Sequence, residues 1–497
     1  MEKLKKKIQS LIHYMSWKNI SSEVKTYGYE ISVKSILIIF LVYFFLTVVA
    51  GFMFKLTPPF MSITLMAGFI FLPAIIMNAY KQRFEQQKFS DVSQYIEQML
   101  YSFRGNKKIL TSLKEVEPLF ANGPMGKLIR EAEQLVTDKN IEVALDHIEK
   151  EYDCNKMKQA HKVLIEAERR GGDVDDTIEL LLVDRTKWVD RTLDFQKEKK
   201  QKKTTIMMSI ITSYLICIIM ERILPSQVNI SNLVLTQVTS TLLFIASLFI
   251  YYLTDKSISV SWLKGTENMN PNEVRRYYKY IMNYDAKTEF MKSLKMLVIP
   301  IILVLLAFYT AEWFALVLAA FFAVFILLRH KIVYAKRLKL LKKEITIQFP
   351  RWLMEMALLM QSNNVQVALY KSINSAGEVL KPELIKLSNA LTENPNASLP
   401  YIEFMKFFDM PEITSSMKLF YAISNGSGGD VNQQIRDIIN RNNLMLDKAE
   451  RLANENSIAG MYMLFLSPQI FGGAKLMIDM VVFFLAFMGN FGDLGVY

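Results

Sequence analysis

The sequence predicts an all-α, polytopic membrane protein, with about eight transmembrane helices in four hairpins and two cytoplasmic six-helix bundles. Three observations predict this fold class: the apolar stretches occur in pairs, the hydrophilic stretches have helical periodicity, and the hydrophilic stretches repeat one another. Of the 497 residues, 51% are hydrophobic, which excludes intrinsic disorder. The two cysteines, Cys154 and Cys217, are too few for a disulfide scaffold.

The paired apolar stretches define the membrane hairpins. A helix needs about 17–25 residues to cross the hydrocarbon core, and the first four stretches meet this length. The predicted helices are 36–54 and 60–79, 205–223 and 233–253, 296–312 and 314–328, and 457–474 and 476–491. The breaks within these pairs are Lys55 to Pro59, Pro225 to Asn232, Glu312-Trp313, and Gly472 to Lys475.

Eight segments follow along the chain. They are a cytoplasmic N-terminal segment (1–34), hairpin 1 (35–80), the first cytoplasmic domain (81–204), hairpin 2 (205–254), a cytoplasmic linker (255–295), hairpin 3 (296–328), the second cytoplasmic domain (329–456), and hairpin 4 with a short tail (457–497).

Charged residues orient the predicted helices. Of the 59 Lys and Arg residues, 56 fall on the side of the hydrophilic stretches, and only Lys55, Arg222 and Lys475 fall on the other side. Such a bias marks the cytoplasmic face of a membrane protein, so we expect both termini in the cytoplasm. Because 44 of the 48 carboxylates share that side, the net charge of +11 does not indicate a nucleic-acid partner.

Both hydrophilic domains are predicted to be helical. Apolar residues recur every three or four positions, for example at Val92, Ile96 and Leu100. Turn-forming residues divide the first domain into about six helices. These breaks are Gly105-Asn106, Ala121 to Pro124, Thr137-Asp138, Tyr152-Asp153 and Gly171-Gly172.

An internal repeat relates the two domains. Gly171-Gly172-Asp173-Val174 recurs 257 residues later as Gly428-Gly429-Asp430-Val431. A glycine at C′ can end one helix in the left-handed conformation, and an Asp can cap the next helix, so a turn is the plain interpretation of both motifs. Further matches at nearly the same offset are Leu128-Ile129 with Leu384-Ile385, Tyr152-Asp153 with Phe408-Asp409, and Phe89 with Phe349.

Residues Asp175 to about Ile223, after the first turn, include neither proline nor glycine. If all are helical, they extend for roughly 70 Å, from the cytoplasmic domain into the membrane. A second such helix is expected from Val431 to about Ala459. Because an unbroken helix transmits rotation or tilt, this geometry suits a protein whose cytoplasmic part is pushed and whose membrane part responds.

Patterns of an enzyme, a metal site or a cofactor site are missing from the sequence. It has no Gly-x-x-x-x-Gly-Lys-Ser/Thr phosphate loop, and no Cys or His pair has metal-site spacing. Asp173, Asp175 and Asp176 cluster where a helix dipole favours acids regardless of chemistry. The four histidines are scattered, and we expect His147 and His161 on ordinary helix faces.

Ion coupling also lacks a candidate at this stage. A transporter usually needs polar groups near the middle of the bilayer. The ionisable residues of the membrane segments all fall near predicted outer ends: Glu221, Arg222, Glu312, Lys475 and Asp479.

These features resemble the F-domain family of type II secretion, type IV pilus, Tad pilus and archaellum platform proteins. The resemblance rests on Phe89 and Phe349, on the two Gly-Gly-Asp-Val turns, and on the basic helix from Trp188 to Lys203. Eight membrane helices in hairpins resemble the Tad and archaeal branch most. The second copy departs from the first, with Met445 in place of Trp188 and Arg441 in place of Asp184.

The resemblance implies an assembly platform in the cytoplasmic membrane, without catalytic activity. Such a protein docks a hexameric secretion ATPase, passes pilin-like subunits into a filament, and can form a homodimer. We expect ATPase contacts at Arg169, Arg170, Lys187 and Arg191 in the first domain and at Arg275, Arg276 and Lys279 in the linker. Solvated surface residues are the simpler interpretation of these cations. A solute transporter or channel, and a membrane scaffold or sensor with another partner, stay open as alternative functions.

Overall fold

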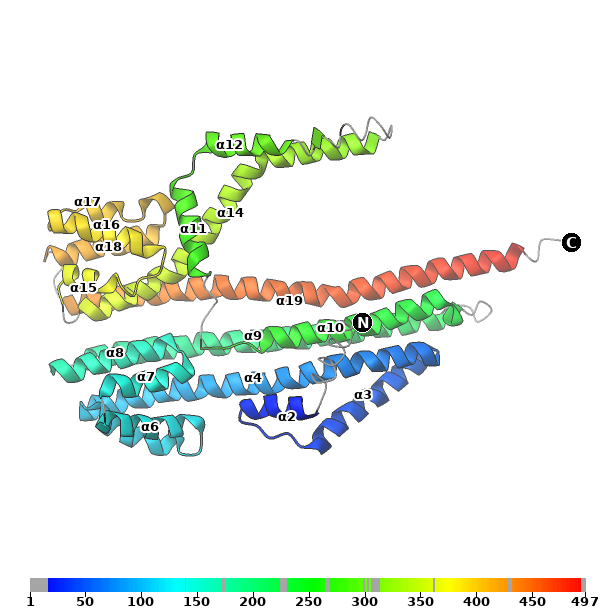
Figure 1. The fold of residues 1–497 in the computed structure, drawn as a ribbon, viewed down its shortest axis with the longest axis horizontal. Helices are drawn as coiled ribbons and strands as arrows, with labels where there is room; N and C mark the ends of the chain where they lie inside the picture. The colour runs from blue at the N-terminus through cyan, green and yellow to red at the C-terminus, as the bar shows by residue number, and fades with distance from the viewer. Residues whose placement is uncertain are drawn as a thin grey trace, which may run out of the picture. The chain divides into compact units, whose positions relative to one another are not determined.

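The computed structural model forms two compact units and is all helical where it is described, as the sequence predicted. The described residues are 17–138, 140–171, 175–223, 230–263, 269–297, 300–301, 304, 313–360, 363–426 and 431–492. Unit 1 comprises Met1–Asp173, Arg185–Gly265 and Asn454–Tyr497, and unit 2 comprises Val174–Asp184 and Thr266–Ala453. Figure 1 labels the helices of both units.

Five helices within the described residues are long and apolar enough to cross a membrane. They are α3 (Val33–Met53), α4 (Pro58–Asn106), α9 (Asp175–Ile223), α10 (Val234–Ile258) and the Ile458–Met488 part of α19 (Val431–Gly492). The helices α3 and α4 match the first predicted pair, and α9 and α10 carry the apolar stretches of the second pair.

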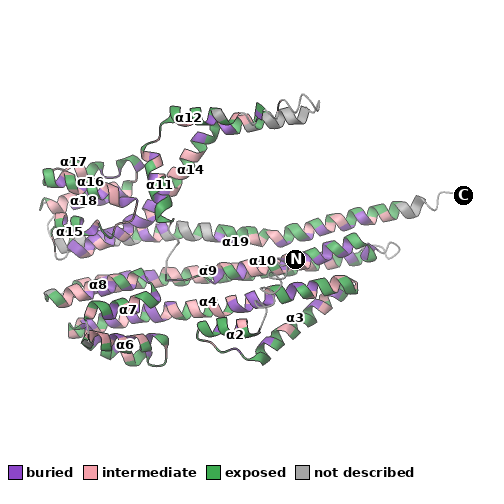
Figure 2. Cartoon of the chain, viewed as in Figure 1, coloured by how far each residue is buried: buried purple, intermediate pink, exposed green. Residues whose placement is uncertain are grey.

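The apolar helices of unit 1 expose large side chains on their outer faces. On α3, Leu41 and Phe45 are 68% and 63% exposed, and exposed residues follow the length of this helix in Figure 2. Contiguous apolar surface of this extent is what a helix presents to lipid. The structure is therefore consistent with a membrane protein.

The helix α4 is longer than the sequence analysis expected. The predicted membrane helix 60–79 and the first helix of the following domain form one helix of 49 residues. Between residues 80 and 104 the sequence contains no proline or glycine that would end the helix. The helix ends at Lys107, which adopts the left-handed conformation with φ 57°.

The rest of α4 packs into a helical bundle in unit 1. Phe89 and Trp188 meet in its core, edge to face with 5.0 Å between ring centroids. The helix ends fall at the predicted breaks, and α7 ends at Asp153 in the left-handed conformation. The other members are α5 (Ile109–Val116), η1 (Glu117–Phe120), α6 (Pro124–Asp138), α7 (Ile141–Tyr152), α8 (Asn155–Arg170) and α9 from Arg185.

Unit 2 contains a second helical bundle. Its core includes Phe349 and Trp352 of α14, and Trp352 Nε1 donates a hydrogen bond to Ser372 Oγ at 2.8 Å. The members are α14 (Trp313–Met360), α15 (Val365–Ser372), α16 (Leu380–Glu393), α17 (Leu399–Glu403), η4 (Lys406–Phe408), α18 (Pro411–Ser424) and the start of α19.

The predicted linker 255–295 is partly folded against this second bundle. Its helices are α11 (Pro271–Met282) and α12 (Ala286–Leu294), followed by η3 (Lys295–Leu297). Val274 and Ile281 are buried in the core of unit 2, because α11 is amphipathic and one face is apolar.

The predicted turn from Gly472 to Lys475 is wrong, because α19 continues through it without a break. The glycine serves a close helix approach instead: a Cβ atom at Gly472 would lie 2.2 Å from Ser213 Oγ of α9. The fourth predicted hairpin is therefore one helix. Of the third hairpin, α14 carries residues 314–328, whereas most of 296–312, including Glu312, lies outside the described residues.

Candidate functional site

A groove of about 710 Å³ lies on the first bundle, between α7 and α8. Asn140 fixes the start of α7 by accepting the Val143 N–H at 2.8 Å, and the turn at Asp153 returns the chain into α8. The lining residues are Glu142, Leu145, Asp146, Glu149, Lys158, Lys162, Ile165, Glu166 and Arg169. The charged lining residues of α7 are all acidic, and those of α8 are basic except for Glu166. A groove with both signs of charge suits a protein surface of mixed charge better than a phosphate group.

Charges around the groove are paired. Arg169 forms an ion pair with Glu142, and Lys158 donates a hydrogen bond to Asp153 at 2.9 Å. This hydrogen bond raises the pKa of Lys158 above its ordinary value. Because exposed pairs of this kind contribute little to stability, they are available for exchange with charges of a partner.

A buried hydrogen-bond chain leads from the groove to α4. His161 Nδ1 lies 2.8 Å from Glu149 Oε1, and His161 Nε2 lies 3.0 Å from the Tyr95 hydroxyl. The Glu149 carboxylate can only accept a hydrogen bond, so His161 Nδ1 donates to it. In the neutral tautomer with its proton on Nδ1, the ring accepts a hydrogen bond from the Tyr95 hydroxyl at Nε2. The Tyr95 and His161 side chains are at most 1% exposed, whereas Glu149 reaches the groove. This chain of hydrogen bonds therefore connects the groove to α4, and α4 also continues into the apolar part of unit 1.

The two histidines of this bundle differ from one another. The expectation of an ordinary helix face holds for His147, which is partly exposed and lies 2.8 Å from Glu131, a contact that lowers the pKa of Glu131. His161 also lies on a helix, α8, but on its buried face, since it is 1% exposed. Periodicity could have indicated the burial, since His161 lies four residues after Met157 and three before Leu164, both fully buried.

The predicted ATPase contacts of the first domain differ in position and burial. Arg169 lines the groove, Lys187 is exposed on α9, and Arg191 is half-buried on α9. The side chain of Arg170 lies outside the described residues, as do Gly172 and Asp173.

Gly171 ends α8, as the sequence predicted. It adopts φ +66°, and its N–H donates to the Ala167 carbonyl at 3.0 Å. In the second bundle, Gly428, Gly429 and Asp430 lie outside the described residues, and Gly426 just after α18 has φ +67°.

The predicted contacts of the linker all lie on α11 in unit 2. Arg275 donates to Glu378 Oε2 from Nε at 3.1 Å and from Nη2 at 2.8 Å. Arg276 is 3.5 Å from Glu273 on the same helix, and Lys279 is exposed. Arg275 thus has a partner in unit 2 outside α11, whereas Arg276 and Lys279 face solvent.

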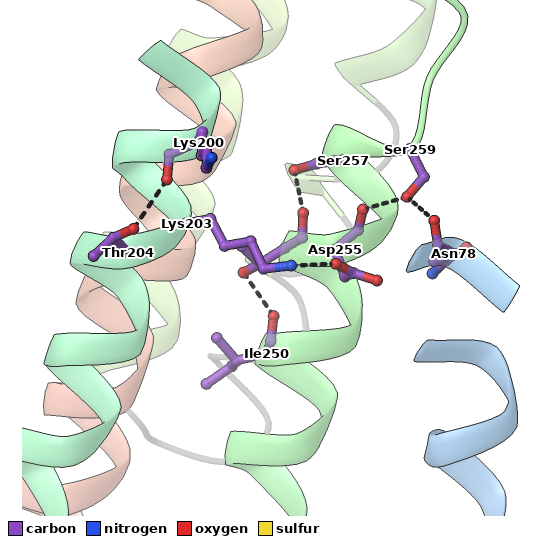
Figure 3. A network of polar contacts seen from close by, with 9 residues as sticks. Asn78, Lys200, Lys203, Thr204, Ile250, Asp255, Ser257 and Ser259 are labelled. Atoms are coloured by element: carbon purple, nitrogen blue, oxygen red, sulfur yellow. Dashed lines mark hydrogen bonds and ion pairs between the residues drawn. The ribbon is translucent and has the colours of Figure 1, made fainter. Parts of the chain in front are cut away.

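A polar network that the sequence analysis missed joins three helices of unit 1 where their apolar stretches end (Figure 3). Lys203 Nζ of α9 donates to Asp255 Oδ1 of α10 at 2.6 Å, and Asp255 is 1% exposed. The Ser259 hydroxyl donates to the Asn78 carbonyl of α4 at 2.9 Å. A signal was present, since Lys203 and Asp255 are charged residues that directly flank predicted membrane helices.

Lys199 strengthens the same boundary one turn earlier on α9. Its Nζ donates to the Ser257 carbonyl at 3.0 Å and lies 4.6 Å and 5.3 Å from the ring centroids of Phe195 and Trp262. We name Lys199, Lys203, Asp255, Ser257 and Ser259 the boundary network.

Comparison with known proteins finds no matching family, no similar characterised sequence and no similar solved structure. No group of three or more His, Cys, Asp or Glu side chains among the described residues is arranged to hold a metal ion.

Proposed function

We propose that this chain is a membrane platform subunit of a type IV filament or type II secretion machine. In this proposal it docks a hexameric secretion ATPase on its cytoplasmic bundles and passes the movement to membrane helices that handle pilin-like subunits. One observation carries the proposal: in unit 1, α4 and α9 each continue unbroken from the bundle into an apolar stretch.

The two long helices of unit 1 are connected to their neighbours at two levels. In the bundle, Arg185 of α9 is 3.0 Å from Glu97 of α4 and donates to the Ser93 carbonyl at 3.0 Å. At the apolar boundary, the boundary network joins α9 to α10 and α10 to α4. A push on the bundle would therefore move these helices together rather than bend a loop.

The proposal includes a duplicated bundle. Asp153 and Asp409 support it, because they are 256 residues apart and adopt left-handed φ angles of 43° and 48°. Each follows a buried aromatic residue, Tyr152 or Phe408. A non-glycine residue rarely adopts this conformation, so its recurrence at one position of two bundles favours a common origin.

The proposed orientation follows the Lys and Arg distribution, with both bundles in the cytoplasm. Because α19 has no turn at residues 472–475, a single crossing by this helix would put the C-terminus on the opposite side from the N-terminus. This revises the expectation that both termini are cytoplasmic. A protease or labelling assay at each terminus tests it in intact cells.

Docking is tested by co-purification. The full chain is co-expressed with a P-loop ATPase encoded in a neighbouring reading frame, and the recovered ATPase is measured after detergent extraction. We expect Arg169→Glu with Arg170→Glu to lower recovery at least about tenfold, since a like-charge juxtaposition at an interface costs several kcal/mol. Lys127→Glu is the matched control, because Lys127 is 76% exposed on α6 and does not line the groove. Failure of the unmodified chain to recover any ATPase would overturn the proposal.

A transporter is the second candidate function, because Glu221, Lys475 and Asp479 are buried among the apolar helices of unit 1. Substrate-dependent flux in liposomes that contain the purified chain would favour this function over a platform.

A further inference from the structure

Three ionisable side chains are buried together in the apolar part of unit 1. Glu221 of α9 is 8% exposed, and Lys475 and Asp479 of α19 are 2% and 5% exposed. Their sequence positions predicted all three near the outer ends of membrane helices, but α19 continues on both sides of Lys475 within one apolar stretch. Buried ions carry a large desolvation penalty, so the charge of this group has to be balanced locally.

Lys475 and Asp479 balance one another. They form an ion pair one helical turn apart, between Nζ and Oδ2. Lys475 Nζ also lies 5.4 Å from the ring centroid of Phe54, which is itself 1% exposed. The Lys475 charge therefore has its counterion and a favourable aromatic contact.

Glu221 is left without a cation in contact among the described residues. Its Oε1 accepts a hydrogen bond from Ser231 Oγ at 3.2 Å. The titratable groups that face it are Lys475 and Asp479 from α19, the exposed Lys55 from the turn after α3, and Cys217 one turn earlier on α9. With both carboxylates ionised, the buried group has a net charge of −1.

Two buried oxygen atoms of this group, Glu221 Oε2 and Asp479 Oδ1, have no hydrogen-bond partner within the part of the chain that the structure describes. One belongs to each carboxyl group, and neither can donate while both groups are ionised. A single added proton on Oε2 removes the net charge and turns one of these acceptors into a donor.

The surrounding backbone is fixed by Gln237, which is 2% exposed. Its side chain donates to the Lys55 carbonyl at 2.9 Å and to the Ser231 carbonyl, and accepts the Thr57 N–H at 2.9 Å. The turns after α3 and before α10 are therefore held together beside Ser231, so the environment of Glu221 is preformed.

We propose that Glu221 binds a proton and that Glu221, Lys475 and Asp479 form a neutral proton-binding site among the apolar helices. The proposal does not depend on the ATPase-docking function. The affinity of Glu221 for this proton depends on the charges of Asp479 and Lys475, since each alters the electric field at Glu221.

Infrared spectroscopy of the purified full chain tests the site directly. At neutral pH we expect the carbonyl stretch of a protonated carboxylic acid, with a shift in D₂O, and we expect Glu221→Gln to remove one such band. Glu131→Gln, at an exposed carboxylate paired with His147, is the control and should leave the band unchanged. A spectrum in which Glu221→Gln removes no band would overturn the proposal.

A second variant separates a proton from another bound cation. Asp479→Asn leaves Lys475 without its counterion, so Glu221 should ionise in response and the band should disappear although Glu221 is present. Folding of each variant is checked by thermal unfolding. A band that persists in Asp479→Asn would show that Glu221 holds its proton independently of Asp479 and Lys475, so the three residues would not form one neutral site. If sodium ions raise the unfolding midpoint of the unmodified chain but not of Glu221→Gln, the site binds sodium rather than a proton.

Discussion

Lys203 of α9 donates a hydrogen bond to Asp255 of α10 across 2.6 Å, where both helices leave their apolar stretches (Figure 3). Lys203 is 22% exposed at its side chain and Asp255 only 1%. The Asp255 carboxylate is thus more deeply buried than the Lys203 ammonium group. The stability of the ionised carboxylate therefore depends on its hydrogen bond from Lys203. This asymmetry makes the pair a sensitive probe of how firmly the two helices are joined.

Removing the cation of this pair should destabilise the chain strongly. Lys203→Met leaves the Asp255 carboxylate buried without its counterion, which typically costs about 3–5 kcal/mol. We expect this loss in the free energy of unfolding, measured by denaturant titration in detergent micelles. Lys200→Met is the matched control, since Lys200 is exposed on the same helix, and its effect should stay within about 0.5 kcal/mol.

The double variant Lys203→Met with Asp255→Leu tests the cause of that loss. Replacing both members of a buried pair by apolar groups is often neutral, so most of the stability should return. A double variant as unstable as Lys203→Met alone would show that the desolvated carboxylate is not the reason.

The hydrogen-bond chain between the groove and α4 should also be measurable. His161→Leu removes both of its bonds and leaves the Tyr95 hydroxyl buried and unsatisfied, for an expected loss of about 3 kcal/mol in the free energy of unfolding. Tyr95→Phe removes one hydrogen bond and keeps the hydrogen bond between His161 and Glu149. We therefore expect a loss of about 1 kcal/mol in the free energy of unfolding. Equal effects of His161→Leu and of the surface variant His147→Leu would contradict the assignment.

Much of the fold follows from local sequence signals. The break after Asn106, the turn at Asp153 and the uninterrupted run from Asp175 to Ile223 all lie where the structure has them. These features depend on turn chemistry and on the absence of glycine and proline, which are properties of neighbouring residues. For the same reason the start of α9 and the end of α8 were predictable.

Features that depend on distant residues were missed. Gly472 suggested a turn, but its role is set by Ser213, more than 250 residues away in the sequence. The burial of Glu221 likewise depends on α19, and the link from Glu149 through His161 to Tyr95 depends on three helices of the bundle. The neighbouring residues of a glycine look the same in a turn and at a helix contact, and those of an acid look the same at a surface and in a buried group. Only the packing distinguishes the two cases.

The left-handed conformation of Asp153 and Asp409 has a steric cost that can be measured. Glycine adopts this conformation without the steric cost of a Cβ, so Asp409→Gly should raise the free energy of unfolding by about 1 kcal/mol. Asp153→Gly should give a smaller gain, because Asp153 also accepts the hydrogen bond from Lys158. Thermal unfolding of both variants beside Asp409→Ala, which keeps the Cβ and should give no gain, provides the comparison. A loss of stability in Asp409→Gly would contradict the conformational reason.

Adjacent glycines of α19 offer the most direct test of how α9 and α19 pack. A methyl group at Gly472 would lie 2.2 Å from Ser213 Oγ, whereas one at Gly473 meets no atom within 4 Å. The hydroxyl of Ser213 donates to the Pro468 carbonyl at 2.8 Å, and that of Ser209 to the Phe465 carbonyl at 2.8 Å. Gly472→Ala has to displace the Ser213 hydroxyl from its hydrogen bond or move the helices apart, which we expect to cost about 1–3 kcal/mol in the free energy of unfolding.

Gly473→Ala is the matched control in the same turn and adds the same methyl group. Because alanine is the better helix former, this variant should be neutral or more stable by up to about 1 kcal/mol. Ser213→Gly combined with Gly472→Ala should recover part of the loss, since the added methyl group then takes the volume that the Ser213 side chain gave up. Denaturant titration of the four proteins gives the comparison. Equal effects of the two alanine variants would mean that α9 does not approach α19 closely at Gly472.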